Sequence, residues 1–530
     1  MKKTLELTLS PEIAFDENEL HQHIKSSLQI KEENTFHIRL LKRSIDARSR
    51  QIKVNLQAEI YVDELPEPLL QHQSAYKDVT NAKQAIIVGA GPAGLFAALR
   101  LIELGVKPVI IERGKDVQER RRDLANINKK NIVNENSNYC FGEGGAGTYS
   151  DGKLYTRSKK RGDIRRILEI LVAHGANENI LYEAHPHIGT NKLPKLIQEI
   201  RNTILQYGGE IHFNTIVTDF ILESNEMKGV VTNAVVGVIH QQQEYHGIGV
   251  ILATGHSARD VFELLHHKNI LIEAKPFALG VRIEHLQSLI DSIQYKCADR
   301  GIYLPAASYS LVEQVKVGTQ QKGVFSFCMC PGGFIVPSAT SQNEIVVNGM
   351  SPSKRDSPFS NSGMVVAVDE SDWKNFRQFG PLAAMEYQKS VERNAWQIAG
   401  QTQIAPAQKM QDFVSRKVSP SLLETSYQPG LVSVEMRDFL PNDIAFCLQE
   451  GFKSFGNKMR GYLTNDAQII GVESRTSSPV KIPRDKETFE HVSTQRLFPC
   501  AEGAGYAGGI MSAAMDGERC AEKLAELYAL

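Results

Sequence analysis

Residues 85–94 read AIIVGAGPAG and join a short apolar run to a glycine-rich turn. The apolar run predicts a buried strand. The glycines that follow it have the spacing Gly89-x-Gly91-x-x-Gly94. Apolar side chains then recur at helical spacing up to Gly105, and a second apolar run comes directly after that residue. The stretch therefore predicts a strand, a tight turn, a helix and a second strand in direct succession.

Each glycine of this turn has its own physical reason. Gly89 permits the tight turn, Gly91 lets the backbone approach a pyrophosphate group, and Gly94 lets helix and strand pack closely. The predicted helix N-terminus offers free N–H groups and a partial positive charge to phosphates. Glu112 ends the second strand, where its carboxylate can accept hydrogen bonds from both ribose hydroxyls. The stretch predicts a dinucleotide-binding unit; the alternative is an ordinary glycine-rich turn followed by a chance glutamate.

The bulk composition excludes several classes of protein. A chain of 530 residues with 42% hydrophobic and 23% charged residues is typical of a soluble globular protein of several domains. The net charge of −1 gives no general attraction to nucleic acid or to anionic membranes, so we expect neither as a partner. The N-terminal residues lack the apolar core of a signal peptide. The 7 cysteines form no CxxC or zinc spacing, which favours a reducing cytoplasm and no metal site.

The chain divides into four expected segments. Alternating apolar residues and one helical repeat predict a small β-α-β-β module at the N-terminus, and Pro66 and Pro68 indicate a linker after it. The expected fold class is α/β, with a discontinuous Rossmann-like domain, an inserted α+β substrate or capping domain and the N-terminal α+β module. The expected boundaries are 1–80 for the module, 84–274 and 456–530 for the two parts of the Rossmann-like domain, and 275–455 for the insertion.

The N-terminal module also carries a basic cluster. The segment LKRSIDARSR contains Lys42, Arg43, Arg48 and Arg50 between two predicted strands. Such a cluster could bind an anion or RNA, but a solvated hairpin is the favoured interpretation.

Two further glycine-rich segments are candidates for ligand contact. FGEGGAGTYSDGKL, residues 141–154, has four glycines in six residues, which lets the backbone pass close to a flat ligand or a phosphate. AEGAGYAGGI, residues 501–510, precedes a helical pattern. That helix N-terminus could hold a developing negative charge, as on a reduced flavin, and Glu502 could bind a ribityl hydroxyl. A plain C-terminal helix with a glycine-rich entry is the alternative.

Together these motifs resemble a known superfamily. GAGPAG, the mid-chain sequence Ala253-Thr254-Gly255 and the terminal glycine-rich loop are similar to those of two-dinucleotide-binding, glutathione-reductase-like FAD flavoproteins. More narrowly, almost the whole chain resembles bacterial uncharacterised FAD-dependent dehydrogenases. The segments that carry this resemblance are FGEGGAGTYSDGKL, HPHIGTNKL (185–193), ATGHSARD (253–260), KPFALGVRIEH (275–285), FCMCPGG (327–333), ESRTSSPVKIPRD (473–485) and PCAEGAGYAGGI (499–510).

The resemblance implies FAD as the cofactor and a set of contacts to it. The implied contact residues are Gly89, Gly91, Pro92, Ala93, Gly94, Glu112, Arg113, Gly144, Gly145, Gly147, Val217, Thr254, Gly255, Glu502, Gly508, Gly509 and Ile510. The backbone near Val217 is expected to meet the adenine. The superfamily often has Gly-Asp where this chain has Ala501-Glu502, which is a departure at the ribityl contact.

The candidates for catalysis are Arg282, His285, Cys328, Cys330 and Arg475. Cys328 and Cys330 could be redox partners, but a buried packing role is favoured because a CxC disulfide is strained. Cys140 stands alone where flavin disulfide reductases have two close cysteines, which argues against that class. The arginines and His285 could bind an anionic substrate or stabilise hydride transfer; structural salt bridges are the alternative. His256 is expected to be structural.

The sequence thus predicts an FAD-dependent oxidoreductase, a dehydrogenase or reductase. It would transfer a hydride or an electron pair between a small-molecule substrate and flavin. A second nucleotide-binding motif is missing from the sequence, so NAD(P)H would visit the substrate cleft only as a transient electron donor. Two alternatives stay open: a flavin-dependent RNA-modifying protein that uses the N-terminal module as a platform, and a flavin-binding redox sensor without turnover.

Overall fold

The computed structural model describes residues 2–49, 51–67, 75–156, 162–236 and 239–529. Arg50 of the basic cluster lies outside these residues. Within them, the strand, turn, helix and second strand predicted from AIIVGAGPAG are confirmed. Among the described residues, no helix combines the length and the apolar character that a membrane span requires.

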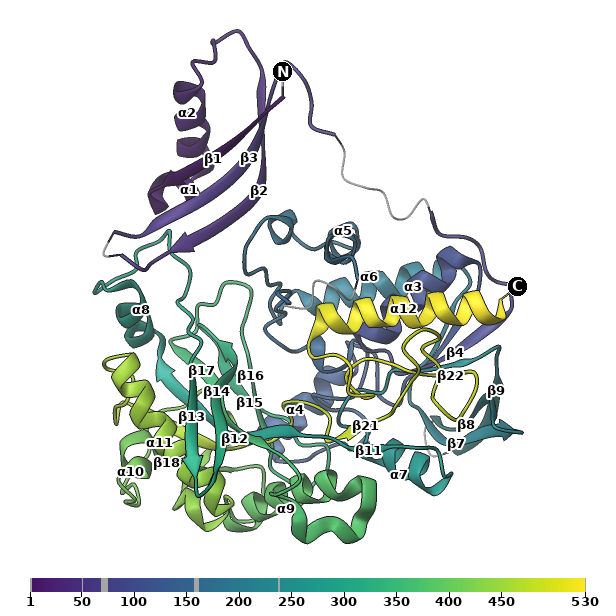
Figure 1. Cartoon of the computed structure of the whole chain (residues 1–530). Helices are drawn as coiled ribbons and strands as arrows, with labels where there is room; N and C mark the ends of the chain where they lie inside the picture. Colours follow the sequence, from purple (N-terminus) through teal and green to yellow (C-terminus); the bar gives the residue numbers. More distant parts are fainter. Residues whose placement is uncertain (1, 50, 68–74, 157–161, 237–238, 530) are drawn as a thin grey trace.

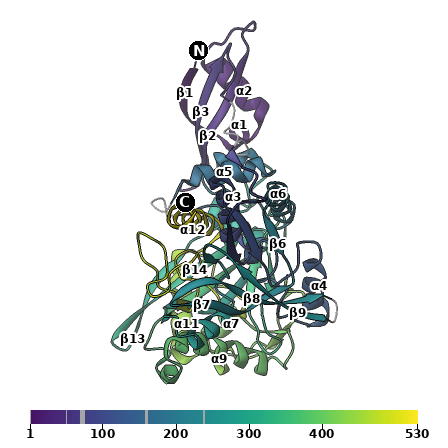
Figure 2. The same cartoon turned by 90° about the vertical axis from the view of Figure 1, so that its right-hand side faces the viewer.

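The N-terminal module stands at one end of the molecule (Figures 1 and 2). Its elements are β1 (Lys2–Leu9), α1 (Pro11–Phe15), α2 (Glu17–Ser27), β2 (Phe36–Asp46) and β3 (Lys53–Val62). The strands form an antiparallel sheet in the order β1-β3-β2, which confirms the predicted β-α-β-β sequence of elements. Asp16 caps α2 by accepting the N–H of Asn18 at 3.0 Å and of Glu19 at 3.1 Å. Leu20 and Ile24 of α2 pack on the sheet.

Arg43 of the basic cluster joins this module to the rest of the chain. Its backbone N–H donates to Tyr182 O at 2.8 Å, and its Nε donates to Glu183 at 2.8 Å. Its guanidinium also lies over the rings of Phe15 and Tyr182, 4.5 and 5.2 Å from their centroids. Arg48 pairs with Asp46 of its own hairpin. Two of the basic side chains are therefore engaged within the protein.

A five-stranded parallel sheet is built around the predicted unit, in the order β22-β10-β4-β5-β6. Its strands come from distant parts of the sequence: β4 (Gln84–Val88), β5 (Lys107–Ile111), β6 (Glu210–His212), β10 (Val250–Leu252) and β22 (Leu497–Pro499). The chain leaves this sheet after β10 and returns at β22, so the domain is discontinuous, as the sequence predicts. A parallel sheet of this order with crossover helices is a Rossmann-like arrangement.

The two faces of this sheet are covered by different layers. Ala85 and Ile87 of β4 face a helical layer, whereas Ile86 and Val88 face a layer that includes an antiparallel sheet. The helices of the first layer are α3 (Pro92–Leu104), α5 (Ile164–Ala173), α6 (Leu193–Gln206) and α12 (Ile510–Tyr528), and Figure 1 shows α3 and α12 side by side. The strands of the second layer are β7 (Thr215–Glu223), β8 (Glu226–Val236) and β9 (Ile239–His246). Burial on both faces explains the continuous apolar run of β4.

The insertion is built on a seven-stranded sheet, in the order β13-β14-β17-β12-β20-β18-β19, which we call the inserted sheet. Its strands are β12 (Phe277–Leu286), β13 (Val312–Val317), β14 (Gln320–Cys330), β17 (Phe359–Val368), β18 (Ala405–Lys409), β19 (Leu431–Ser433) and β20 (Ala467–Glu473). The helices with it are α8 (Gln287–Tyr295), α9 (Ala383–Ile398), α10 (Met410–Val414) and α11 (Asn442–Lys458). β20 pairs with β12 and β18, so the expected boundary at residue 455 falls inside the sequence that forms this sheet. That pairing is long-range, and no local pattern reveals it.

Smaller elements connect these layers. They are α4 (Arg120–Lys130), α7 (Arg259–His267), β11 (Glu273–Ala274), β15 (Phe334–Pro337), β16 (Val347–Met350) and β21 (Val480–Lys481). The short 3₁₀ turns are η2 (Gly145–Gly147), η3 (Glu178–Leu181), η4 (Lys374–Leu382) and η5 (Met436–Asp438).

Candidate functional site

A cavity of about 420 Å³ lies between the parallel sheet and the inserted sheet, and we call it the central cavity. The turns that follow β4, β5 and β10 open into it, as expected for a ligand site at the carboxyl ends of parallel strands. The remaining walls come from residues between Gly145 and Lys153, from Phe327 and Cys328 of β14, and from the glycine-rich loop before α12. Its size is within the range of about 300–1,000 Å³ that is usual for ligand and cofactor sites.

The three glycines of the first turn are constrained in different ways. Gly89 has φ +106°, and a Cβ atom there would lie 2.5 Å from the carbonyl oxygen of Ala253. A Cβ atom at Gly94 would lie 2.0 Å from the carbonyl oxygen of Gly89. A Cβ atom at Gly91 would meet no described atom closer than the Cα of Gly145, at 4.0 Å. The fold itself therefore requires glycine at positions 89 and 94, whereas position 91 faces open space in which a ligand fits.

Two helix N-termini open into the central cavity. α3 begins after Gly91 and α12 after Gly509, and within the described residues neither has a side-chain cap. The two helices touch closely, since a Cβ atom at Gly517 of α12 would lie 2.1 Å from the carbonyl oxygen of Ala93. Uncapped N-termini carry partial positive charge and free N–H groups, which suits the phosphates of a dinucleotide.

Glu112 has a second role that the sequence did not predict. Its Oε1 accepts the N–H groups of Gly114 at 2.8 Å and Gly142 at 3.0 Å, and its Oε2 accepts the N–H of Ala90 at 2.8 Å. The carboxylate thus ties three loop segments together at the wall of the central cavity. Since Oε1 already accepts two hydrogen bonds, Oε2 keeps the free capacity for a ribose hydroxyl. The ribose contact itself stays a prediction.

Other predicted contacts lie along the same wall. Arg113 pairs with Asp260, and its guanidinium lies 4.6 Å from the centroid of the Phe141 ring. The Thr254 hydroxyl is buried, and no described residue hydrogen-bonds to it. An unpartnered buried hydroxyl on the cavity wall is a donor and acceptor that a bound cofactor could satisfy.

The terminal glycine-rich loop places Glu502 beside His256. His256 Nε2 lies 3.7 Å from Glu502 Oε2, and the Ser257 hydroxyl lies 3.1 Å from His256 Nδ1. The other Glu502 oxygen accepts the N–H of Gly509. Burial lowers the pKa of His256 below its ordinary value, although Glu502 opposes this. His256 was expected to be structural, yet it lines the central cavity.

Most of the predicted cofactor contacts therefore come together. The residues that line the central cavity are Gly89, Gly91, Pro92, Ala93, Glu112, Arg113, Gly145, Gly147, Val217, Thr254, Gly255, Glu502, Gly508, Gly509 and Ile510. Gly94 and Gly144 lie outside this lining. Gly94 packs on Gly89, and the N–H of Gly144 donates to Ala90 O at 2.8 Å, so both positions shape the turn rather than face the cavity.

The candidates for catalysis divide into two groups. Cys328 and Arg475 line the central cavity, whereas Arg282, His285 and Cys330 lie behind its wall. Arg282 is fully buried; its Nε donates to Glu473 at 2.7 Å and one of its terminal nitrogens to Cys328 O at 3.3 Å. His285 Nε2 lies 2.9 Å from Tyr462 O, and burial lowers the pKa of His285 to about 4. His285 thus packs within the inserted sheet.

Arg475 belongs to a buried group of four charges that joins the layers. It contacts Glu344 at 2.9 Å and Glu392 at 3.0 Å, and Arg259 contacts the same two carboxylates at 2.9 and 2.8 Å. Burial alone would raise the pKa of Glu392, but the two arginines hold it at about 2. Arg259 lies on α7, in the Rossmann-like domain, and Glu392 lies on α9, which packs with the inserted sheet. This group therefore stabilises the contact between the Rossmann-like domain and the insertion. The alternative of a structural salt bridge describes Arg475 well.

The residues on the cavity wall that were not assigned to the site from the sequence include Asp151, Lys153 and Asn348. Lys153 Nζ donates to Met329 O and lies 3.7 Å from Asp151 Oδ2, while Arg355 pairs with Asp151 at 2.7 Å. A local signal existed for two of them, because Asp151 and Lys153 closely follow the GEGGAG glycines. Asn348 lies almost 200 residues further along the chain and gave no such signal.

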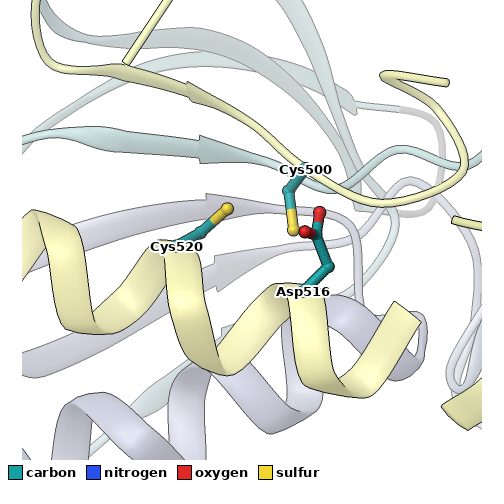
Figure 3. Close-up of side chains that lie close together, drawn as sticks. All are labelled: Cys500, Asp516 and Cys520. Carbon is teal, nitrogen blue, oxygen red and sulfur yellow. The ribbon is translucent and has the colours of Figure 1, made fainter. Parts of the chain in front are cut away.

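One group of side chains within the described residues could offer three metal ligands. The ligand atoms of Cys500, Asp516 and Cys520 lie within 4.8 Å of one another (Figure 3). Arg484 already donates to both oxygens of Asp516, at 2.6 and 2.9 Å, and the N–H of Ala501 donates to it at 2.7 Å. The guanidinium of Arg484 thus stands where a metal cation would bind. We infer that these side chains instead hold the start of the terminal glycine-rich loop in place.

Comparison with known proteins also indicates an FAD-binding protein. Three family models match: a domain of unknown function over residues 1–61, an FAD binding domain over residues 82–128, and an "FAD-dependent protein, C-terminal domain-like" model over residues 276–476. The last of these ranges ends just after β20, with the end of the inserted sheet.

Similar proteins and structures were also found. An uncharacterized protein of Clostridium beijerinckii is 37% identical, and the match covers 97% of each chain. Thiamine thiazole synthase of Aeropyrum pernix is 30% identical over 33% of this chain and 54% of its own. The solved flavin-dependent brominase Bmp2 has 13% identity and a TM-score of 0.36, over 85% of this chain and 80% of its own. From the full-length match and the two FAD models, the chain belongs to the family of FAD-binding flavoproteins that includes the Clostridium beijerinckii protein.

Proposed function

We propose that this flavoprotein is an FAD-dependent oxidoreductase whose cofactor occupies the central cavity. The observation that carries the proposal is the open space at Gly91, which faces two uncapped helix N-termini in a chain of an FAD-binding family. FAD, when bound, supplies the capacity to accept and donate a hydride or an electron pair. The protein supplies position, electrostatics and exclusion of water.

The chain's own residues would divide the work of holding the cofactor. Gly91 and Ala93, at the start of α3, would hold the pyrophosphate, and Glu112 with the backbone near Val217 would hold the adenosine half. Glu502 and the N-terminus of α12 would hold the flavin half, because a helix N-terminus favours negative charge on a reduced flavin.

The substrate would enter at the end of the central cavity that the inserted sheet closes. Lys153, Cys328 and Asn348 line that end and could contact a small polar molecule. NAD(P)H would visit the same end as a transient donor. The narrower assignment as a dehydrogenase and a cytoplasmic location belong to this proposal; the 7 free cysteines suit a reducing compartment.

The test begins with the cofactor. The protein is purified, the bound flavin is released by denaturation and identified, and the holoprotein is mixed anaerobically with NADH, NADPH and a library of small metabolites. We expect FAD to be found and its absorbance near 450 nm to bleach with at least one donor. A protein that neither retains nor takes up FAD would overturn the cofactor assignment. Bound FAD that no donor reduces would favour the redox sensor.

A further inference from the structure

We propose that Cys328 and Cys330 form a thiol–disulfide exchange centre at the inserted-sheet end of the central cavity. Cys328 is the nucleophile, Cys330 is the resolving thiol, and the substrate class is a low-molecular-weight disulfide that fits the cavity. The inference rests on the proposed function in one respect: it assigns a substrate class to the same cavity. The exchange itself uses only the thiols of Cys328 and Cys330.

The local backbone brings the two sulfur atoms together. Cys328 Sγ and Cys330 Sγ lie 4.0 Å apart. In a regular strand, side chains two residues apart share a face but are separated by about 6.5–7 Å along the chain. Here Cys328 has φ +45°, and the pairing of β14 with β17 shifts register between Phe327 and Cys330. The bulge therefore brings the two sulfurs closer than a regular strand would, which departs from the regular buried strand assumed when the sequence favoured a packing role.

Two cations hold this bulge in place. A terminal nitrogen of Arg282 donates to Cys328 O at 3.3 Å, and Lys153 Nζ donates to Met329 O. Both carbonyl groups belong to the segment between the two sulfurs. A non-glycine residue with positive φ costs free energy, so it persists where neighbouring contacts fix it, and such residues cluster at functional sites.

The two thiols differ in access. Cys328 is partly exposed and lines the central cavity beside Phe327 and Asn348, whereas Cys330 is fully buried behind it. A disulfide in the cavity can thus reach Cys328, and only Cys328 can reach Cys330. This order of access is the one that a nucleophile and a resolving thiol require.

The charges around the pair favour a thiolate at Cys328. The hydrogen bond between the two thiols lowers the pKa of Cys328 to about 5, with help from the positive charges of Lys153 and Arg282; burial and Asp151 act in the opposite sense. The same hydrogen bond and burial raise the pKa of Cys330. Glu473, paired with Arg282, is a further charged group close to Cys328, and Tyr309 lies close to Cys330. A partly exposed thiol in an electropositive site is the usual setting of a reactive cysteine.

The exchange balances without any further reactant. The Cys328 thiolate attacks one sulfur of R–S–S–R, which forms a Cys328–S–S–R bond and releases RS⁻. Cys330 then loses its proton and attacks Cys328 Sγ, which forms the Cys328–Cys330 disulfide and releases the second sulfur as a thiol that carries that proton. Two protein thiols are oxidised by two electrons, and the substrate disulfide is reduced to two thiol products.

The test reads the thiols directly, in both the FAD-loaded and the FAD-free protein. The fully reduced protein is treated with 2-hydroxyethyl disulfide, quenched with acid and mapped by peptide mass spectrometry. We expect a Cys328–Cys330 disulfide and the release of two 2-mercaptoethanol molecules per chain. Cys330→Ser should stop at a stable mixed disulfide on Cys328. Cys328→Ser should abolish the reaction at this site, and Cys297→Ser, a cysteine outside the cavity lining, should leave it unchanged.

A second measurement follows the nucleophile. With iodoacetamide at about pH 6, Cys328 should react at least about tenfold faster than Cys140, the other cysteine on the cavity wall. Lys153→Met should move the pH midpoint of Cys328 alkylation upward by about 1 unit.

Equal rates at Cys328 and Cys140, or a mixed disulfide that never resolves to the pair in the wild type, would overturn the proposal. FAD content, measured in the same samples, reports separately on the proposed function. If the protein holds no FAD but thiol exchange is intact, only the cofactor assignment is overturned.

Discussion

The two ends of the central cavity are built in different ways. At the first end, the turn after β4, the N-terminus of α3 and Glu112 lie within one short stretch of sequence, and the wall there is largely backbone. At the other end, Lys153, Cys328 and Asn348 reach the cavity from segments far apart in the sequence, and the wall consists of side chains. The first end is specified by steric limits on glycine, and the second by long-range packing.

The way in which each end is built limits what it can do. A backbone cradle binds phosphate through geometry that many enzymes share, so it identifies a cofactor class and leaves the reaction open. Side chains placed by long-range contacts determine which substrate reacts. The two ends should therefore respond differently to mutation.

The largest expected effect is at Gly91. Gly91→Val should abolish FAD retention, because its side chain fills the space at the helix N-terminus, while the apoprotein should keep most of its melting temperature because a Cβ atom there comes no closer than 4.0 Å to another described atom. Gly94→Val is the contrasting variant: its Cβ atom would lie 2.0 Å from Gly89 O, so the apoprotein itself should be destabilised. The checks are FAD content after purification and melting of both apoproteins. A yellow, fully loaded Gly91→Val protein would contradict the cofactor assignment.

The second largest effect is expected at the buried group of four charges that joins the Rossmann-like domain to the insertion. Glu392→Gln leaves Arg259 and Arg475 short of one buried negative charge, which should lower the free energy of unfolding by about 3–5 kcal/mol. Glu386→Gln on the same helix removes one partly exposed pair with Lys389 and should cost about 0–1 kcal/mol. Denaturant unfolding of the two variants makes the comparison. Equal stabilities would show that this group does not hold the Rossmann-like domain and the insertion together.

Glu112 lies at the same end of the central cavity as Gly91, where the wall is largely backbone. Glu112→Ala removes an acceptor from three N–H groups and from any ribose contact, so FAD binding should weaken by about 2–4 kcal/mol. Glu112→Gln keeps one acceptor oxygen and should fall between Ala and the wild type. Titration of the apoproteins with FAD measures both. Unchanged affinity in Glu112→Ala would refute the role of this carboxylate.

The smallest expected effect is a pH dependence in the inserted sheet. Burial lowers the pKa of His285 to about 4, whereas an unfolded histidine protonates near 6.5. Between these values the unfolded state binds more protons, so stability falls as the pH drops through this window, by up to about 3 kcal/mol. His285→Gln should flatten this slope, and His267→Gln, at an exposed position, should not. The free energy of unfolding is measured at a series of pH values for both variants. If its slope against pH is unchanged in His285→Gln, the effect is ruled out.

The first end of the cavity was predictable from the sequence because its contacts are local. Gly89, Gly91 and Glu112 lie in one strand–turn–helix–strand unit, which the apolar runs and the glycine spacing predict, and the structure places all three at the central cavity. The parallel sheet and its interruption were predictable for a similar reason, since most of its strands are apolar runs close to a glycine turn; β6, with the sequence Glu-Ile-His, is an exception.

The second end was not predictable, because it depends on pairing between distant strands. β20 joins β12 across almost 200 residues, which moved the end of the insertion past residue 455. The bulge at Cys328 likewise depends on β17, which lies some 30 residues further on, so a CxC sequence read alone suggested packing. Lys153 gave a weak local signal, and Asn348 gave none.

A crystal structure of the FAD-loaded protein would show directly whether the cofactor occupies the central cavity. We expect one FAD there, with its pyrophosphate against the backbone at Gly91 and Ala93 and its flavin ring toward Glu502 and Cys328. FAD bound outside this cavity, or with its two ends reversed, would contradict it.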